Sequence, residues 1–172
     1  MNVVPESAAI IQERRVTTHF TIRRATAADA ADVLICLHEA FAPYRGLYSE
    51  EGFRDTTLDE DTVQRRISEM CVFIAADAEG EVAGTIGGAA NDGQGHIRGM
   101  AVRPPWAGTG AAQTLLEAIE AELRGRGCTR VTLDTTEPLE RAMRFYERNG
   151  YRRTGHVGDF FGMPLYEYAK QL

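Results

Sequence analysis

The chain has 172 residues, of which 44% are hydrophobic and 26% are charged, and its formal net charge at pH 7 is −6. This length predicts about one domain, and the composition excludes a disordered or fibrous chain. The acidic charge balance argues against a dedicated nucleic-acid binder, which normally shows a basic excess.

One strand and two helices are expected first along the chain. Alternating apolar and polar residues predict a strand over 19–24. A T-x-x-D box beginning at Thr26 predicts the start of a helix that runs to about residue 41. Residues 44–57 show no clear period and are interpreted as a loop, which either contacts a substrate or only connects. A second helix, with an acidic first turn, is expected over 59–70.

The rest of the chain is richer in strands. Its predicted elements, in chain order, are strands over 71–76, 82–90 and 95–102, a helix over 110–126, a strand over 130–135, a helix from Pro138 to about 149, and strands over 151–157 and 164–168. The resulting order, β-α-α-β-β-β-α-β-α-β-β, combines hairpins with crossovers. It predicts one α/β domain with a mixed sheet and helices on both faces.

The segment between the strand over 95–102 and the helix over 110–126 carries the strongest chemical signal. Gly108 and Gly110 allow the backbone to bend closely around a ligand, and free N–H groups at the helix start point to one spot. The segment is therefore either a phosphate site or a tight turn without a ligand. No Gly-Lys-Ser/Thr follows, which excludes a Walker loop, and Gln113 stands where a dinucleotide fingerprint has its third Gly or Ala.

Two motifs in this chain resemble those of the GNAT superfamily of acetyl-CoA-dependent N-acyltransferases. The first, V-x-P-x-x-Q/R-x-x-G-x-G/A, is matched by Val102, Pro104, Gly110 and Ala112, with Ala107 in place of the usual Gln or Arg. The second is a helix ending A-x-x-F-Y-x-x-x-G-F. Its matching residues are Ala142, Phe145, Tyr146, Gly150 and Tyr151, the last in place of Phe.

The resemblance implies a single GNAT-like domain over residues 19–172, with a largely antiparallel sheet of about six or seven strands. It implies transfer of an acetyl group from acetyl-CoA to a primary amine. Because no Cys or Ser–His pair suggests an acyl-enzyme, we expect direct attack in a ternary complex. The cofactor-binding residues would be Met100, Ala101, Val102, Ala107, Gly108, Thr109, Gly110, Ala111 and Ala112. The alternatives are a non-catalytic acyl-CoA-binding or regulatory module on the same fold, and the same enzyme class with another acyl donor.

Tyr146 and His96 are the catalytic candidates that the resemblance implies. Tyr146 would protonate the departing thiolate or donate a hydrogen bond to it, although its helical position alone also fits a core tyrosine. His96 stands where many relatives carry a glutamate, and a neutral imidazole there could accept the amine proton. A surface histidine, with water as the base, is the other interpretation. Gly99 marks either a bulge in this strand or an ordinary strand position.

The sequence also suggests where the protein acts and with what. Residues 1–18 show no signal peptide and are interpreted as an N-terminal arm, and no stretch approaches the roughly 20 apolar residues of a membrane span. Three cysteines without a C-x-x-C pair predict no metal site and a cytoplasmic location. The expected partner is a small-molecule or peptide amine rather than a nucleic acid or a membrane, and the resemblance allows a homodimer.

Overall fold

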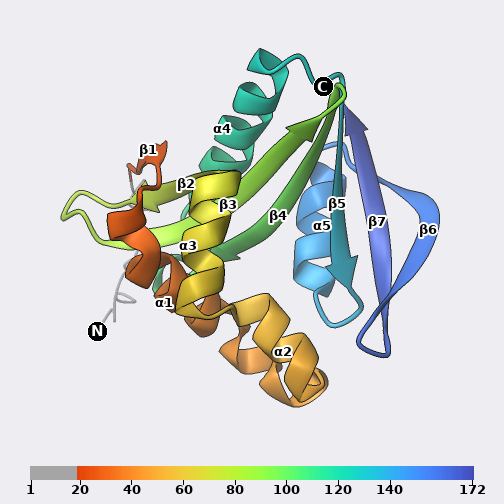
Figure 1. Ribbon diagram of the computed structural model, residues 1–172, viewed down its shortest axis with the longest axis horizontal. Helices are drawn as coiled ribbons and strands as arrows, with labels where there is room; N and C mark the ends of the chain where they lie inside the picture. The colour runs from red at the N-terminus through yellow and green to blue at the C-terminus, as the bar shows by residue number, and fades with distance from the viewer. Residues whose placement is uncertain (1–18) are drawn as a thin grey trace, which may run out of the picture.

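The protein is described by a computed structural model of residues 19–172, and the N-terminal arm predicted over 1–18 lies outside the described residues. Within residues 19–172 a seven-stranded sheet has the strand order β1-β2-β3-β4-β5-β7-β6 (Figure 1). The strands are β1 (Thr21–Arg24), β2 (Cys71–Ala76), β3 (Val82–Asn91), β4 (Gln94–Val102), β5 (Arg130–Thr136), β6 (Arg152–Phe160) and β7 (Met163–Gln171). All neighbours are antiparallel except β4 and β5, which confirms the mixed, largely antiparallel sheet.

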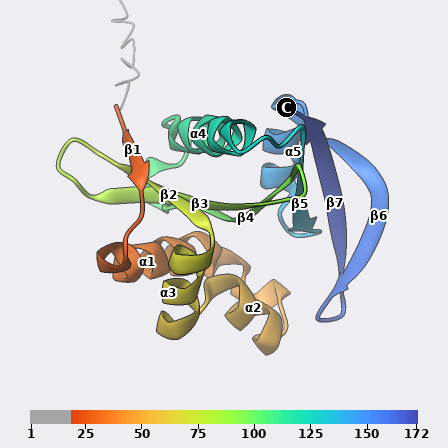
Figure 2. The ribbon, with the colours of Figure 1, turned by 45° about the horizontal axis from the view of Figure 1, so that its top comes forward.

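Helices cover both faces of this sheet (Figure 2). One layer contains α1 (Ala30–Phe41), α2 (Glu50–Thr57) and α3 (Glu60–Glu69), and the other contains α4 (Ala111–Gly125) and α5 (Glu140–Arg148). Each layer buries its own hydrophobic cluster against the sheet. Leu115, Ile119 and Leu123 of α4 belong to one cluster together with Tyr146 of α5, whereas Leu37 of α1 belongs to the other. The predicted two-sided α/β architecture is therefore confirmed.

One element of the prediction is wrong. The other predicted strands and helices are present with ends displaced by a few residues, but residues 44–57 are not a loop. Residues Ala42–Leu47 form 3₁₀ turns and α2 follows, which adds a helix to the predicted order. The Ser49 side chain accepts the Gly52 N–H at 3.1 Å and so caps α2. An eight-residue helix is too short to show a clear period in sequence, and the burial of Phe53 supplies its stability.

The strands β4 and β5 separate part-way along their length. They pair only where Gln94–Ile97 lies beside Arg130–Leu133, although β4 continues to Val102 and β5 to Thr136. On its other edge β4 contains a bulge, because Thr85 of β3 faces Ala101 while Gly87 faces Arg98. Gly99 lies in this bulge with a φ of +67°, a backbone conformation that favours glycine. Of the two interpretations of Gly99, the structure therefore supports the bulge.

Candidate active site

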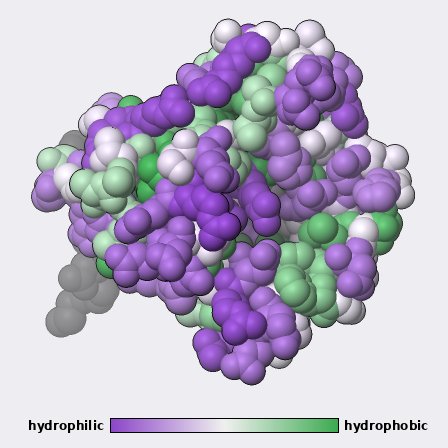
Figure 3. Space-filling view, in the orientation of Figure 1, coloured by the Kyte–Doolittle hydropathy of each residue, from purple (hydrophilic) through white to green (hydrophobic). Residues whose placement is uncertain are grey.

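A cavity of about 940 Å³ occupies the region where β4 and β5 diverge. It is lined by both strands, by the start of α4, by α5, and by residues of the α1–α3 layer, so it connects the two sides of the sheet. In the space-filling view, hydrophilic side chains cover α2 and α3, and a hydrophobic patch lies over the β6–β7 end of the sheet (Figure 3). The sequence-predicted site residues that line the cavity are His96, Met100, Ala101, Val102, Ala107, Gly108, Gly110, Ala112 and Tyr146.

The turn before α4 presents free main-chain donors to this cavity. Within residues 19–172, no acceptor is found for the N–H groups of Gly110, Ala111 and Ala112, and the first bond of the helix runs from the Thr114 N–H to the Gly110 carbonyl at 3.1 Å. Gly110 has a φ of +99°, and a Cβ built there meets no atom within 4 Å. The positive end of the helix dipole adds to these donors, so the turn fits a diphosphate. Thr109 and Ala111 belong to this turn without lining the cavity.

Two arginines that the sequence analysis missed lie on the same side of the sheet. Arg141 and Arg148 of α5 line the cavity together with Phe145. Their positions follow the i, i+4, i+7 spacing of one helix face, which was a signal available in the sequence. They bring positive charge to a site whose glycine turn has no Lys or Arg, because Ala107 replaces the basic or amide residue of the motif.

The edge of β4 that faces the cavity is unpaired where the strands separate. The Arg103 N–H donates to the Ala83 carbonyl of β3 at 2.8 Å. Because main-chain groups alternate along an antiparallel ladder, the N–H of Val102 points the opposite way, toward the cavity. The same alternation turns the main-chain groups of Ala101 toward β3. The bulge shifts the side-chain alternation as well, so Met100 packs with the α4 and α5 cluster while Ala101 packs with the α1 cluster.

Tyr146 reaches the cavity from α5. Its side chain is buried, and its hydroxyl donates to Sδ of Met100 at 3.2 Å. Burial raises the pKa of the Tyr146 phenol well above its ordinary value. The group is therefore a protonated donor at neutral pH, and its thioether partner is a weak acceptor that a stronger one can replace.

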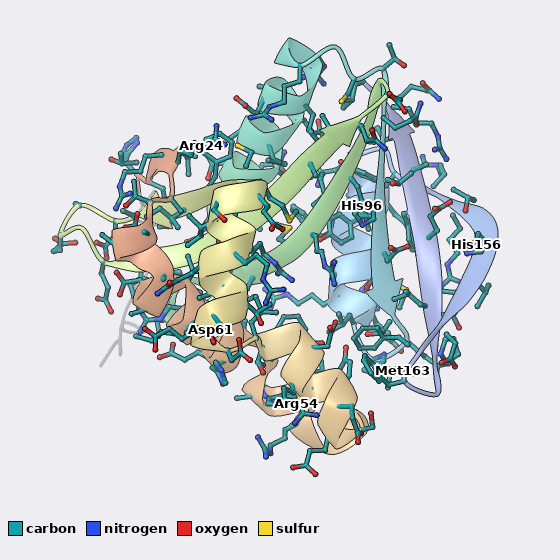
Figure 4. All side chains as sticks on the ribbon, in the orientation of Figure 1. Arg24, Arg54, Asp61, His96, His156 and Met163 are labelled. Atoms are coloured by element: carbon teal, nitrogen blue, oxygen red, sulfur yellow. The ribbon has the colours of Figure 1, made fainter. Side chains whose placement is uncertain are left out.

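His96 lies in the stretch of β4 that pairs with β5, opposite Thr132 (Figure 4). Its neighbour Ile97 packs in the same cluster as Tyr146, so by strand alternation the His96 side chain points to the other face of the sheet. Its Nδ1 is 2.9 Å from Oγ1 of Thr132, and its Nε2 is 3.6 Å from Oδ2 of Asp134. Both partners lie on β5, so the histidine bridges the two diverging strands. Asp134, which the sequence analysis did not single out, lines the cavity beside it.

Aromatic side chains line the cavity beside the C-terminal end of β5. Tyr48 hydrogen-bonds Thr136 of β5, and its ring packs edge-to-face on Phe160 with centroids 6.3 Å apart. A Cβ built on Gly52 of α2 would lie 3.4 Å from the Phe160 ring, so α2 touches the β6–β7 hairpin. The segment predicted as a loop therefore contributes walls to the cavity through Tyr44 and Tyr48.

Comparison with known proteins decides what family this architecture represents. The sequence model of the acetyltransferase (GNAT) family matches residues 35–151. An aminoglycoside N(6')-acetyltransferase type 1 of Stenotrophomonas maltophilia is 32% identical over 155 residues, which cover 84% of this chain and 94% of that protein. The chain belongs to the GNAT acetyltransferase family. It is an acetyltransferase that moves an acetyl group from acetyl-CoA to an amine.

Solved structures show the same fold. The PaiA N-acetyltransferase of Thermoplasma acidophilum, determined in complex with coenzyme A, superposes with a TM-score of 0.78 at 18% identity, covering 90% of this chain and 99% of that one. A GCN5-related N-acetyltransferase of Rhodopseudomonas palustris superposes with a TM-score of 0.75 at 22% identity, covering 91% and 98%. The GNAT fold expected from the two motifs is thus confirmed over nearly the whole described chain.

The described part of the chain can be examined for metal ligands, membrane-spanning helices and reactive thiols. Among residues 19–172, no group of three or more His, Cys, Asp or Glu residues is arranged to hold a metal ion. In the same part of the chain, no helix has the length and apolar character to cross a bilayer. Cys36, Cys71 and Cys128 are free and buried, and burial raises the pKa of the Cys36 thiol to about 12, so none offers an exposed nucleophile.

Proposed function

We propose that this GNAT acetyltransferase acts on a primary amine by direct attack on the acetyl thioester in a ternary complex, with Tyr146 as the general acid. The observation that carries the proposal is the hydroxyl of Tyr146, which is protonated, lines the cavity and lies 3.2 Å from Met100 on the unpaired stretch of β4. The same cavity contains the glycine turn before α4, so one compartment holds a diphosphate site and a proton donor together.

Each residue would have a defined task in this reaction. The free N–H groups of residues 110–112 would hold the diphosphate, and the Val102 N–H would bind the pantetheine arm along β4. Tyr146 would exchange its bond to Met100 for one to the departing thiolate and give it a proton. No covalent acyl-enzyme is needed, because the three cysteines are buried.

His96 would accept the proton from the attacking amine, either directly or through water. Its Nδ1 is held by Thr132, and Asp134 beside its Nε2 would stabilise the imidazolium that forms. The amine would therefore approach from the α1–α3 side, opposite Tyr146. The aromatic walls formed by Tyr48 and Phe160 would limit its size and exclude water.

The acceptor class has one candidate from the comparisons. The relative from Stenotrophomonas maltophilia is named as an aminoglycoside N(6')-acetyltransferase, so aminoglycosides belong in any acceptor panel. A cytoplasmic location is part of the same proposal and is supported by the three unpaired cysteines. Homodimer formation is also proposed, from the resemblance alone.

A thiol-release screen tests the proposed function. Acetyl-CoA is incubated with the protein and a panel of amino acids, peptides, polyamines and aminoglycosides, and free thiol is compared with the value measured without amine. We expect amine-dependent release, a product heavier by one acetyl group, and intersecting initial-rate lines. Parallel lines would indicate an acyl-enzyme, and release that no amine increases would contradict the proposal. Propionyl-CoA and succinyl-CoA in the same assay test the choice of acyl donor.

A further inference from the structure

The cavity holds more positive charge than the acidic chain as a whole would suggest. Four arginines line it, namely Arg66, Arg98, Arg141 and Arg148, against two acidic residues, Asp55 and Asp134. The two arginines of α5 lie on the side of the glycine turn, where a diphosphate would use them. The α1–α3 side, from which the amine would approach, therefore contains the other two arginines, both aspartates and His96.

Both aspartates on this side already face a cationic or ionisable partner. Arg98 Nη2 lies 3.8 Å from Oδ2 of Asp55, and His96 Nε2 lies 3.6 Å from Oδ2 of Asp134. The guanidinium of Arg66, by contrast, makes neither a hydrogen bond nor an ion pair with any residue in the described range 19–172. Of the two arginines on the α1–α3 side of the cavity, Arg98 therefore has a carboxylate partner among the described residues and Arg66 has none.

Arg66 lies next to the place where the acetyl group would react. It belongs to α3, and a Cβ added to Gly99 in the β4 bulge would collide with its Nη1. Met100, the next residue along β4, is the one that accepts the Tyr146 hydroxyl at 3.2 Å. Because Gly99 has no side chain, the Arg66 guanidinium can lie against the main chain of the bulge. Gly99 is adjacent in sequence to Met100, which contacts the proposed general acid Tyr146.

The surroundings of Arg66 favour an anionic ligand. Burial and the neighbouring Arg98 lower the pKa of the Arg66 guanidinium to about 10, which Asp55 opposes in part, so the group stays charged at neutral pH. A charged group that has lost hydration without gaining a partner gains more from a ligand of opposite sign than an exposed one does. The planar fork of a guanidinium matches a carboxylate in two hydrogen bonds.

We propose that Arg66 binds a carboxylate of the acceptor, so that the preferred acceptors carry a carboxylate close to the amine that is acetylated. This rests on the proposed acetylation of a primary amine. A polycationic acceptor would meet Arg66 with like charge, and Asp55 on this side already faces Arg98. The structure thus favours amino-acid-like acceptors over aminoglycosides for this chain.

Matched pairs of acceptors test the assignment. Free amino acids are compared with their own carboxamides, which keep the amine and side chain but remove the negative charge, and kanamycin serves as the polycation. We expect kcat/KM about 10- to 100-fold higher for the acids, the range of a charge-assisted hydrogen-bonded pair. The R66Q variant should lose this preference by slowing the acids alone, and R66K should retain part of it. R65Q is the matched control, because Arg65 is exposed on the same helix. This variant should change kcat/KM neither for the acids nor for the carboxamides.

A binding measurement keeps this inference separate from the proposed function. With coenzyme A present, N-acetyl amino acids should raise the melting temperature of the native protein more than their N-acetyl carboxamides do, and R66Q should remove the difference. The role of Arg66 is overturned if acid and carboxamide bind equally, or if R66Q weakens the binding of both to the same extent. It is also overturned if kanamycin is acetylated with a higher kcat/KM than every acid. If no amine is acetylated, the proposed function fails, and the binding comparison still decides whether Arg66 holds a carboxylate.

Discussion

The two ends of the cavity are constructed in different ways. At the end where we propose that the cofactor binds, the free donors are the main-chain N–H groups of Val102 and of residues 110–112, which lie in one short stretch of sequence. At the acceptor end, the groups are side chains from separate elements, such as Arg66 of α3, His96 of β4, Asp134 of β5 and Phe160 of β6. A main-chain site needs glycines at fixed spacing and leaves a short motif, whereas a side-chain site leaves none. This difference explains why the acyl donor can be predicted from the sequence while the acceptor amine cannot.

The substitution with the largest expected effect is at the cofactor end. Gly110→Trp places an indole in the open space before α4 and should abolish coenzyme A binding in a titration calorimeter. Gly127→Trp is the matched control, because Gly127 also has a positive φ, +83°, with nothing within 4 Å of a built Cβ, but lies beyond the other end of α4. Both variants place a non-glycine residue at a positive φ. Normal affinity in folded Gly110→Trp would mean that the diphosphate lies elsewhere.

Tyr146→Phe should lower kcat by about 10²- to 10³-fold with little change in coenzyme A affinity, because a proton donor is lost and the ring is kept. The raised pKa also fixes the sign of a pH effect. The donor must be protonated, so activity of the native enzyme should persist above pH 10 rather than fall through the ordinary tyrosine range.

The control for that change is Tyr151→Phe. Tyr151 is also buried, but its hydroxyl donates to Glu120 at 2.8 Å and it does not line the cavity. This variant removes one buried hydrogen bond to Glu120, which keeps its ion pair with Lys170, so it should lose about 1 kcal/mol of stability and keep its kcat. If both tyrosines change kcat alike, Tyr146 acts by packing and not as the acid.

A smaller effect is expected at the acceptor end when helix α2, which contributes to its wall, is destabilised. Ser49→Ala removes the cap of α2 and should destabilise that helix by about 1 kcal/mol. Amide exchange in α2 should accelerate and acceptor KM should rise a few-fold, while the affinity for coenzyme A stays constant. Ser68→Ala, at an exposed site on α3, is the control and should change neither the amide exchange of α2 nor the acceptor KM. A change in coenzyme A affinity on loosening α2 would show that the two ends are not independent.

The smallest expected effect concerns the departure from the family motif. Ala107→Arg restores a basic side chain beside the glycine turn and should tighten coenzyme A binding about 2- to 5-fold, as an exposed ion pair does. The gain should shrink at high salt, which a titration at two ionic strengths measures. Ala107→Gln separates charge from hydrogen bonding and should give a smaller, salt-independent gain. Unchanged affinity for both would show that the main-chain donors and α5 already satisfy the phosphates.

What could be predicted from the sequence also differs between the two ends of the cavity. Gly108, Gly110 and the Ala142–Tyr151 segment identified the family, because the backbone geometry that they impose is local. For Gly99 the sequence left a bulge and an ordinary strand position open, and the structure decided for the bulge. Residues 44–57 were misassigned as a loop, since α2 is too short to show a period and depends on tertiary burial of Phe53. Arg66 and Asp134 carried no signal, because nothing in their own segments distinguishes them from surface charges.

By itself, the sequence determined the two-sided sheet and the order of all elements except α2, and it predicted the cofactor site, because hydrophobic period and glycine spacing act over a few residues. Only the tertiary structure decided which charged groups share a cavity and which of them are left without a partner. The register of β4 against β5 brings His96 and Asp134 together, and the packing of α3 on the bulge brings Arg66 to Gly99. Those contacts join segments far apart in the chain, so no local pattern encodes them.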